Sequence, residues 1–328
     1  MISPITRSAG YPIARLILRV AVAGGLTVYI LWKSQPRAVL AAAAGADWRP
    51  VGAACLLVLV DRALMAYRWV ALLWTIDRAA RPPLTAVIRI FFVSTFVGTF
   101  LPASIGGDAV RAYSLAKLNI GGADAVASVF MDRMLGVASV LVMAVVGLGI
   151  ARDLAANPTI VAALGVTSAI CVVTLLVIFS RRMAALASRI IGSLPAAFQH
   201  PGHRMLESIR RYASHHGQLA NVLTCSLAVQ FLRIVQAYFL GRGLGIDVPL
   251  TAYVAFIPLI LLVMLLPVTF NGIGTSQVAF VWFFARAGVP AASAFALSVL
   301  FVALGIIGNL PGGLLYAFGR RERTGALN

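Results

Sequence analysis

The sequence predicts an all-α protein that crosses a membrane several times. Hydrophobic residues occupy 61% of its 328 positions, well above the roughly 45 to 50% apolar content of soluble domains. Apolar runs long enough to cross a bilayer alternate with short polar gaps, and the basic residues gather in those gaps. We therefore expect a single transmembrane domain over 1–328, a polytopic membrane protein of about six transmembrane helices and two re-entrant helical hairpins.

Six apolar runs reach the length of about 20 residues that a helix needs to cross the hydrocarbon core. They are residues 13–32, 51–74, 124–150, 159–180, 217–240 and 291–318. The first run is not followed by the small-residue cleavage site of a signal peptide, so we expect it to be retained as a span. The three cysteines, Cys55, Cys171 and Cys225, lie far apart inside apolar runs and suit core positions.

Two further apolar regions, 89–118 and 250–285, are interrupted in the middle. The first contains Leu101-Pro102 and then Gly106-Gly107, and the second contains Leu266-Pro267 and then a pair of glycines. Proline removes a backbone donor and glycine removes a steric restraint, so both residues break helices. Non-helical backbone survives at membrane depth only where protein or water satisfies it. These regions therefore read as re-entrant hairpins.

The chain has a net charge of +17, from 27 Lys and Arg against 10 Asp and Glu, and the positions of the basic residues predict its orientation. The arginines concentrate in residues 7–19, 78–89, 181–211 and 320–323. The positive-inside rule places all four clusters, and hence both termini, in the cytoplasm, and we expect a bacterial inner membrane as the location. Topology and attraction to anionic lipids account for this excess charge without nucleic acid as a partner.

With this orientation, residues 1–150 run in the opposite sense to residues 159–318, which include an amphipathic connector at 181–216. Arg62 and Tyr67 in the first half recur as Arg233 and Tyr238 in the second. The chain therefore reads as an inverted repeat. Inverted repeats with broken helices near the midplane are typical of secondary transporters, in which one repeat rocks against the other.

Ionisable residues within the spans mark the candidate site, because each costs about 2.5 to 3.5 kcal/mol at mid-helix on insertion scales. Asp61 and Arg62 lie in the second span, Asp132 and Arg133 in the third, and Arg233 in the fifth. Adjacent residues on a helix do not face each other. Crossed pairing between the spans, Asp61 with Arg133 or Asp132 with Arg62, is one solution. The alternative is that some arginines stay available to an anion.

The sequence at the two hairpin tips also favours an anion-binding site. After Gly106-Gly107 we expect a helix with Asp108 in its first turn and Arg111 one turn on, and after the glycines of the second hairpin we expect another helix start. Helix N-termini offer free N–H groups to anions. The alternative is that Asp108 only caps a helix and the glycines only permit close packing. The expected headgroup-binding residues are Asp61, Arg62, Gly106, Gly107, Asp108, Arg111, Asp132, Arg133, Arg233, Asn271, Gly272, Gly274 and Gln277.

These motifs resemble the lysylphosphatidylglycerol synthase transmembrane-region family, also called flippase-like membrane proteins. The likeness rests on the two hairpin motifs, on Asp132-Arg133 and on the span from Asp61-Arg62 to Arg68-Trp69, where we expect Arg68 to snorkel to the interface. The resemblance implies a lipid-translocation module, whose relatives handle aminoacylated phosphatidylglycerol, polyprenyl-phosphate-linked sugars or hopanoids.

Two departures limit what the resemblance implies. Ten residues, 319–328, follow the last expected span, so we do not expect the soluble aminoacyl-transferring domain of the bifunctional members. Many relatives continue the second hairpin into an Arg-Glu pair, where this chain has Ser276-Gln277. The missing carboxylate argues against proton coupling at this hairpin.

The expected function is that of a lipid flippase, moving an anionic lipid between leaflets through a polar groove between the two hairpins. The expected partners are membrane lipids, either anionic phospholipid or polyprenyl phosphate, and a homodimer is left open. No nucleophile and base, Walker loop or zinc spacing occurs in the sequence, so we expect neither an enzyme nor a cofactor. Two alternatives stay open: an enzyme acting on lipid phosphates, and a non-transporting partner of a lipid synthase or glycosyltransferase.

Overall fold

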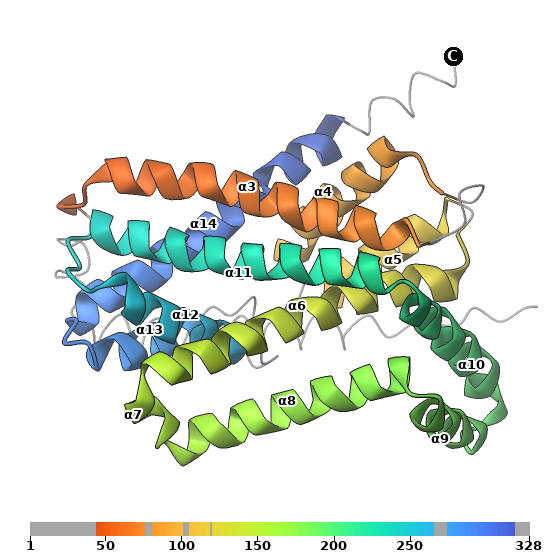
Figure 1. The fold of residues 1–328 in the computed structure, drawn as a ribbon. Helices are drawn as coiled ribbons and strands as arrows, with labels where there is room; N and C mark the ends of the chain where they lie inside the picture. Colours follow the sequence, from red (N-terminus) through yellow and green to blue (C-terminus); the bar gives the residue numbers. More distant parts are fainter. Residues whose placement is uncertain (1–43, 76–80, 101–104, 119, 266–273, 319–328) are drawn as a thin grey trace, which may run out of the picture.

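A computed structural model describes residues 44–75, 81–100, 105–118, 120–265 and 274–318, and the ordered elements in this part of the chain are all helices (Figure 1). Five helices are long and apolar enough to cross a membrane. They are α3 (Trp48–Leu73), α6 (Gly122–Ile150), α8 (Pro158–Phe179), α11 (His216–Gly243) and α14 (Ala291–Phe318). They match five of the six predicted spans and confirm a polytopic membrane protein. The predicted first span, 13–32, lies outside the described residues.

Helices α3 and α11 pack against each other and run antiparallel, side by side (Figure 1). At one end the backbone N–H of Asp47, the N-cap of α3, donates to the carbonyl of Gly243 at 2.8 Å. At the other end the Gln218 side chain donates to the carbonyl of Ala71 at 2.8 Å. The two helices that carry Asp61, Arg62 and Arg233 are therefore held in register over their whole length.

Each interrupted region forms a pair of packed helices. The first pair is α4 (Leu84–Phe100) with α5 (Ile105–Ala116), and the second is α12 (Leu250–Leu265) with α13 (Thr275–Ala285). The pairs lie toward opposite ends of the bundle (Figure 1). Their tips, 101–104 and 266–273, lie outside the described residues. That the pairs re-enter a membrane from opposite faces stays a prediction.

The start of α5 differs from the expectation. The described part of the helix starts at Ile105, directly after residues 101–104, which are not described, and Gly106 and Gly107 lie within the helix instead of ahead of it. A Cβ added to Gly107 would lie 2.9 Å from the carbonyl oxygen of Ser94 and 3.1 Å from the Cα of Gly98, both on α4. Gly107 thus allows the two backbones to approach closely, which is the packing role left open above.

The helix contacts occur in matched couples. Helix α4 packs on α14 as α12 packs on α6, α5 packs on α6 as α13 packs on α14, and α6 contacts α11 as α14 contacts α3. Glycines form both of the first two contacts: Gly312 of α14 lies against the backbone of Phe92 on α4, and Gly147 of α6 lies against that of Ala255 on α12. Exchanging α3–α6 for α11–α14 therefore maps each of these contacts onto its counterpart.

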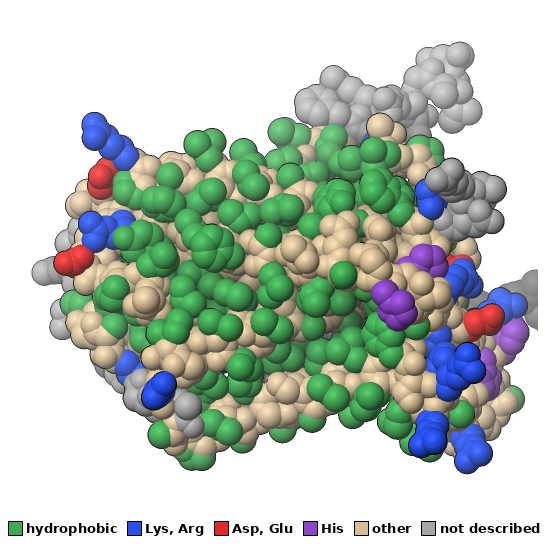
Figure 2. Space-filling model, viewed as in Figure 1, with side chains coloured by type: hydrophobic (Ala, Val, Ile, Leu, Met, Phe, Trp, Pro, Cys, Tyr) green, Lys and Arg blue, Asp and Glu red, His purple; other side chains and the backbone are tan. Residues whose placement is uncertain are grey.

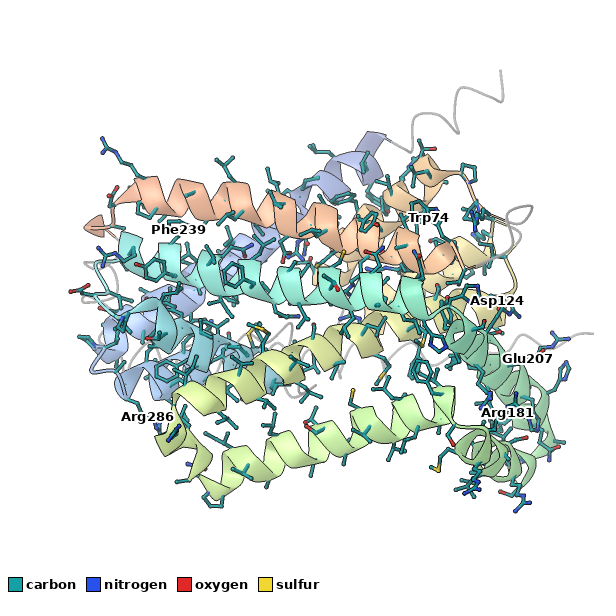
Figure 3. All side chains as sticks on the ribbon, viewed as in Figure 1. Trp74, Asp124, Arg181, Glu207, Phe239 and Arg286 are labelled. Atoms are coloured by element: carbon teal, nitrogen blue, oxygen red, sulfur yellow. The ribbon has the colours of Figure 1, made fainter. Side chains whose placement is uncertain are left out.

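Charged side chains mark the two ends of the bundle. Figure 2 shows hydrophobic side chains over the long middle of the visible face, with Lys and Arg at its ends. The connector contains α9 (Arg181–Gly192), α10 (Ala196–Arg211) and the short η2 (Tyr212–Ser214), while α7 (Arg152–Ala155) links α6 to α8 at the opposite end. Arg181, Glu207 and Trp74 lie toward one end and Arg286 toward the other (Figure 3).

Candidate functional site

A single carboxylate sits between two arginines in the middle of the bundle. Asp61 on α3 is 1% exposed. One of its oxygens lies 3.4 Å from Nη1 of Arg62 and the other lies 3.3 Å from Nε of Arg233 on α11. Two guanidinium groups against one carboxylate leave a formal charge of +1. Asp61, Arg62 and Arg233, three of the predicted site residues, are thus brought together.

These three residues line a cavity of about 230 Å³, which we call the Asp61 cavity. Its walls come from four helices, α3, α11, α12 and α14. The remaining lining residues are Val58, Gln236, Leu261, Met264, Phe301, Val302, Gly305, Ile306 and Asn309. The cavity combines apolar walls with a few polar groups, which is the usual make-up of a small-ligand site.

Several polar atoms around the Asp61 cavity have no hydrogen-bond partner among the described residues. They are Nε of Arg62, Nε2 of Gln236 and Oδ1 of Asn309. Other atoms of the same arginine are satisfied, since Nη2 donates to the carbonyl of Gly305 at 3.2 Å and Nη1 reaches Sδ of Met65 at 3.2 Å. A buried unpaired donor or acceptor costs about 1 to 3 kcal/mol. The cavity is therefore suited to a polar ligand or to water.

A second group of charges, the Asp132 cluster, lies in the bundle interior. Asp132 on α6 accepts from Nε of Arg68 at 2.7 Å and from Nη1 of Arg111 at 3.2 Å. Arg68 also donates to Ser226 Oγ at 3.1 Å, and Arg111 donates to Ser94 Oγ at 3.3 Å. All three charged side chains are buried. This cluster ties α3, α5 and α6 together and carries a formal charge of +1.

Two aromatic rings also stabilise the guanidinium group of Arg111 in this position. Its guanidinium carbon lies 4.6 Å from the ring centre of Phe91 and 5.2 Å from that of Trp69. A guanidinium over an aromatic face gains about 0.5 to 2 kcal/mol, more when desolvated. Arg111 is therefore fully engaged by the protein, and its expected role as a phosphate ligand has no support in its contacts.

The predicted crossed pairing is wrong. Asp132 pairs with Arg68 and Arg111, while Asp61 pairs with Arg62 and Arg233. Arg62 Nη1 lies within 3.4 Å of the adjacent Asp61 and 3.2 Å from Sδ of Met65, because its side chain is long and flexible enough to reach beyond its own face of the helix.

The expectation that Arg68 snorkels to the interface is also wrong. Arg68 is 4% exposed. Asp132 and Ser226 hold its guanidinium inside the bundle, and they satisfy its charge there. A buried partner of opposite charge therefore outweighs the pull of the aqueous interface.

Arg133 and Asp108 form a separate pair. Arg133 Nε and Nη2 donate to the two carboxylate oxygens of Asp108 at 2.7 and 2.9 Å. The Arg133 side chain is 49% exposed and that of Asp108 is 18% exposed. Neither residue lines the Asp61 cavity. The fork geometry fixes α5 to α6 and leaves this pair electrically neutral.

The described residues at the start of the second hairpin's second helix cap the N-terminus of that helix. Gly274, with φ at 92°, precedes α13, and Gln277 Oε1 accepts from the backbone N–H of Gly274 and from Ser276 Oγ. Gln277 therefore serves as a cap, not as a cavity-lining group. Asn271 and Gly272 were also predicted to bind the headgroup, and both lie outside the described residues.

Sequence reasoning missed Met65, Gln236 and Asn309 as members of the central site. Gln236 follows Arg233 by three positions, so it shares a helix face with it, and this spacing was a usable signal. Asn309 is a lone amide in the apolar run of α14, directly before Leu310-Pro311. Met65 gave no signal, because methionine in an apolar helix reads as a core residue.

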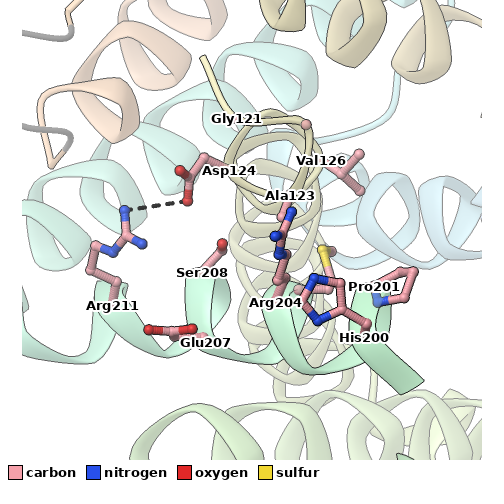
Figure 4. A pocket seen from close by; sticks show the side chains of 12 residues that line it. Gly121, Ala123, Asp124, Val126, His200, Pro201, Arg204, Glu207, Ser208 and Arg211 are labelled. Carbon is pink, nitrogen blue, oxygen red and sulfur yellow. Dashed lines mark ion pairs between the residues drawn. The ribbon is translucent and has the colours of Figure 1, made fainter. Parts of the chain in front are cut away.

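A larger hollow of about 650 Å³ lies at the end of the bundle, where α10 meets the start of α6 (Figure 4). Arg211 pairs with Asp124 there at 3.3 Å, and His200, Arg204 and Glu207 also line the hollow. Basic and acidic side chains are balanced in it. Within the described ranges, no group of three His, Cys, Asp or Glu side chains could hold a metal ion.

The fold and the buried arginine–aspartate groups define a polytopic α-helical membrane protein with a polar cavity inside its helix bundle. Residues 16–312 match the family model described as the lysylphosphatidylglycerol synthase TM region. The chain belongs to this family, as its sequence motifs predicted. Comparison with curated proteins and with solved structures found no match.

Proposed function

We propose that this protein moves an anionic lipid headgroup between the two leaflets of a membrane through the Asp61 cavity. The observation that carries the proposal is the pairing of Arg62 and Arg233 with the single carboxylate of Asp61 beside a cavity of about 230 Å³. Ionisable groups at membrane depth are costly and mark substrate pathways by default. A singly charged phosphate would bring this group of charges to neutrality.

Family membership supports a role in lipid handling, and the apolar bundle supplies the surroundings that a lipid needs. The acyl chains would stay among the membrane-facing side chains, while the headgroup enters the cavity. The proposal is of a transporter and not of an enzyme. Within it, the Asp132 cluster is a scaffold that sets the position of α3, on which Asp61 and Arg62 lie.

The matched helix contacts support alternating access by an inverted repeat. In this proposal α3–α6 corresponds to α11–α14, and the cavity lies where the two halves meet. Secondary transporters built in this way expose a central site to each side in turn by rocking one repeat against the other. Arg62 and Arg233 occupy corresponding positions, so each half contributes one cation.

The orientation in the membrane forms part of the proposal. Arg181, Arg182 and Arg189 lie on α9 at the end of the bundle where α10 and η2 also lie. The positive-inside rule favours this end as the cytoplasmic one, and the inner membrane of a bacterium as the location remains our prediction.

A leaflet-exchange assay tests the proposal. Purified protein is placed in liposomes with trace fluorescent anionic phospholipid, and a membrane-impermeant quencher reports how much lipid reaches the outer leaflet. Arg233→Gln removes one cation and leaves a shorter, neutral side chain that is still polar. We expect exchange to slow by about tenfold or more, because a hydrogen bond to a charged group is worth about 1.5 to 3 kcal/mol and tenfold corresponds to about 1.4 kcal/mol.

Arg242→Gln is the matched control. Arg242 lies near the C-terminal end of the same helix and pairs with Asp247 at 2.9 Å; its side chain is half exposed and that of Asp247 is almost fully exposed. We expect this variant to exchange lipid at the wild-type rate. Wild-type exchange by folded Arg233→Gln protein would exclude the Asp61 cavity as the route, and no exchange by the folded wild type with any anionic lipid would reject the function itself.

A further inference from the structure

The amide of Asn309 is held in one orientation at the edge of the Asp61 cavity. Its Nδ2 donates to Oγ1 of Thr99 at 2.9 Å. The hydroxyl of Thr99 itself donates to the carbonyl of Thr95 at 3.1 Å, so that oxygen can only accept from the amide. Asn309 must therefore present its nitrogen to Thr99. Its Oδ1 is then left as a buried acceptor without a partner among the described residues.

The unpaired atoms around the cavity differ in kind. Arg62 Nε and Gln236 Nε2 are donors, and they suit the oxygens of a phosphate. Asn309 Oδ1 is an acceptor, and a phosphate offers it nothing. Water can donate to this acceptor while the site is empty of lipid. A headgroup that displaces the water must itself carry an N–H or O–H group, or the acceptor is left with its desolvation cost.

The spacing along α14 shows how the Arg62 donor and the Asn309 acceptor lie relative to each other. Gly305, whose carbonyl accepts from Arg62, lies four residues before Asn309, about 6 Å along the helix axis and slightly more than one helical turn. The guanidinium of Arg62 and the Asn309 acceptor therefore lie on the same side of α14, about one turn apart. A headgroup with a hydroxyl or amino group on a short arm beyond its phosphate would satisfy both.

We infer that Asn309 determines the headgroup specificity of this site by accepting a hydrogen bond from a hydroxyl or amino donor of the lipid. The inference rests on the proposed function and names which anionic lipids it favours. Lipids whose phosphate carries such a donor are preferred over lipids of the same charge that lack one. Thr99 is the positioning residue, because it fixes which end of the amide faces the ligand.

This arrangement also links the ligand to the first hairpin. Thr99 lies in the last turn of α4, and Asn309 lies on α14, against which α4 packs. A ligand that binds Oδ1 polarises the same amide whose Nδ2 holds α4, so the two hydrogen bonds strengthen each other. Binding of the preferred headgroup therefore tightens the contact between α4 and α14.

The test compares two fluorescent lipids with identical acyl chains in the leaflet-exchange assay. Phosphatidylglycerol carries hydroxyl donors beyond its phosphate, and phosphatidylmethanol has the same single negative charge and no donor. We expect the wild type to exchange phosphatidylglycerol about three- to tenfold faster, the effect of one net hydrogen bond. Asn309→Leu, of similar size without the acceptor, should bring the ratio of the two rates close to one.

The outcomes separate the inference from the proposed function. Equal wild-type rates for the two lipids would overturn the specificity assigned to Asn309 and leave translocation standing. Exchange of neither lipid by folded protein would overturn the proposed function. If Asn309→Leu kept the wild-type ratio of phosphatidylglycerol to phosphatidylmethanol exchange, a residue other than Asn309 would determine the headgroup specificity.

Thr99→Val provides a second variant that keeps every residue of the cavity. Without the hydroxyl the amide of Asn309 can turn over, so we expect a reduced preference for phosphatidylglycerol at a similar rate for phosphatidylmethanol. An unchanged ratio in this variant would overturn the positioning role of Thr99. The wild-type comparison needs no substitution and keeps the inference testable even if Asn309→Leu fails to fold.

Discussion

Arg68 donates a hydrogen bond of 2.7 Å from Nε to Oδ1 of Asp132, and both side chains are almost completely buried. Arg111 takes the other carboxylate oxygen at 3.2 Å. One carboxylate thus compensates two guanidinium groups from two other helices. Because an isolated charge is very costly in an apolar interior, the position of both arginines depends on Asp132.

Asp132→Asn is therefore expected to be strongly destabilising. Loss of one partner of a buried ion pair costs about 3 to 5 kcal/mol, and here two cations lose their partner. The measurement is thermal unfolding of the purified protein in detergent. Asp124→Asn is the control: its pair with Arg211 is substantially exposed, and such pairs contribute about 0 to 1 kcal/mol. Similar unfolding temperatures for the two variants would contradict the role of Asp132.

Gly312→Ala is expected to separate α14 from α4. A Cβ at Gly312 would overlap the backbone carbonyl of Phe92, which cannot move aside as a flexible side chain can. We expect lower thermal stability and slower lipid exchange. The control is Gly165→Ala on α8, where a Cβ would meet nothing within 4 Å and helix propensity favours alanine. Equal stability of the two variants would show that the α4–α14 contact can relax.

Arg133→Ala should slow exchange much less than Arg233→Gln does. Arg133 was among the predicted phosphate ligands, but its side chain is 49% exposed and is paired with Asp108. The Asp61 cavity keeps all of its charges in this variant. The assay is the same leaflet exchange at matched protein density. If Arg133→Ala alone abolished exchange in folded protein, a second anion site along the path would be required.

Tyr212→Phe tests a buried hydroxyl in the connector, on η2. Burial raises the pKa of Tyr212 above its ordinary value, against a smaller opposing effect of the hydrogen bond with Thr75. Above pH about 10, the ordinary tyrosine pKa, the unfolded chain loses this proton while the folded chain keeps it. The wild type should therefore lose stability as pH rises past this value. Thermal unfolding against pH should show a weaker loss in Tyr212→Phe, and identical curves would refute the assignment.

Hydropathy predicted the long helices because a bilayer sets their length and composition directly. The broken regions were also predictable, since Pro and Gly interrupt the apolar run at 101–107 and near 266–274. The resemblance to the family followed from the same motifs, and the family match bears it out. These features depend on the local sequence alone, so they could be predicted without the structure.

Ion-pair partners were not predictable in the same way. Asp61 and Asp132 each had several arginines within plausible reach, and the choice among them depends on helix rotation and on side-chain rotamers. Arg68 was assigned to the interface because its distance from mid-span allowed snorkelling, yet Asp132 and Ser226 hold it inside. Asn309 lies on the last span, and its contact with Thr99 joins residues 210 positions apart.

Met65 supplies sulfur where an oxygen acceptor would be expected. Nη1 of Arg62 and Nη2 of Arg233 lie 3.2 and 3.4 Å from its Sδ. A thioether is a weak acceptor. Each of the two guanidinium groups therefore donates one N–H to a weak partner, and an anionic oxygen would be a stronger acceptor for both. Oxidation of Met65 to the sulfoxide would turn this sulfur into a strong oxygen acceptor between the same two arginines. In the proposed site, this sulfoxide oxygen would compete with an anionic headgroup for the same two N–H groups.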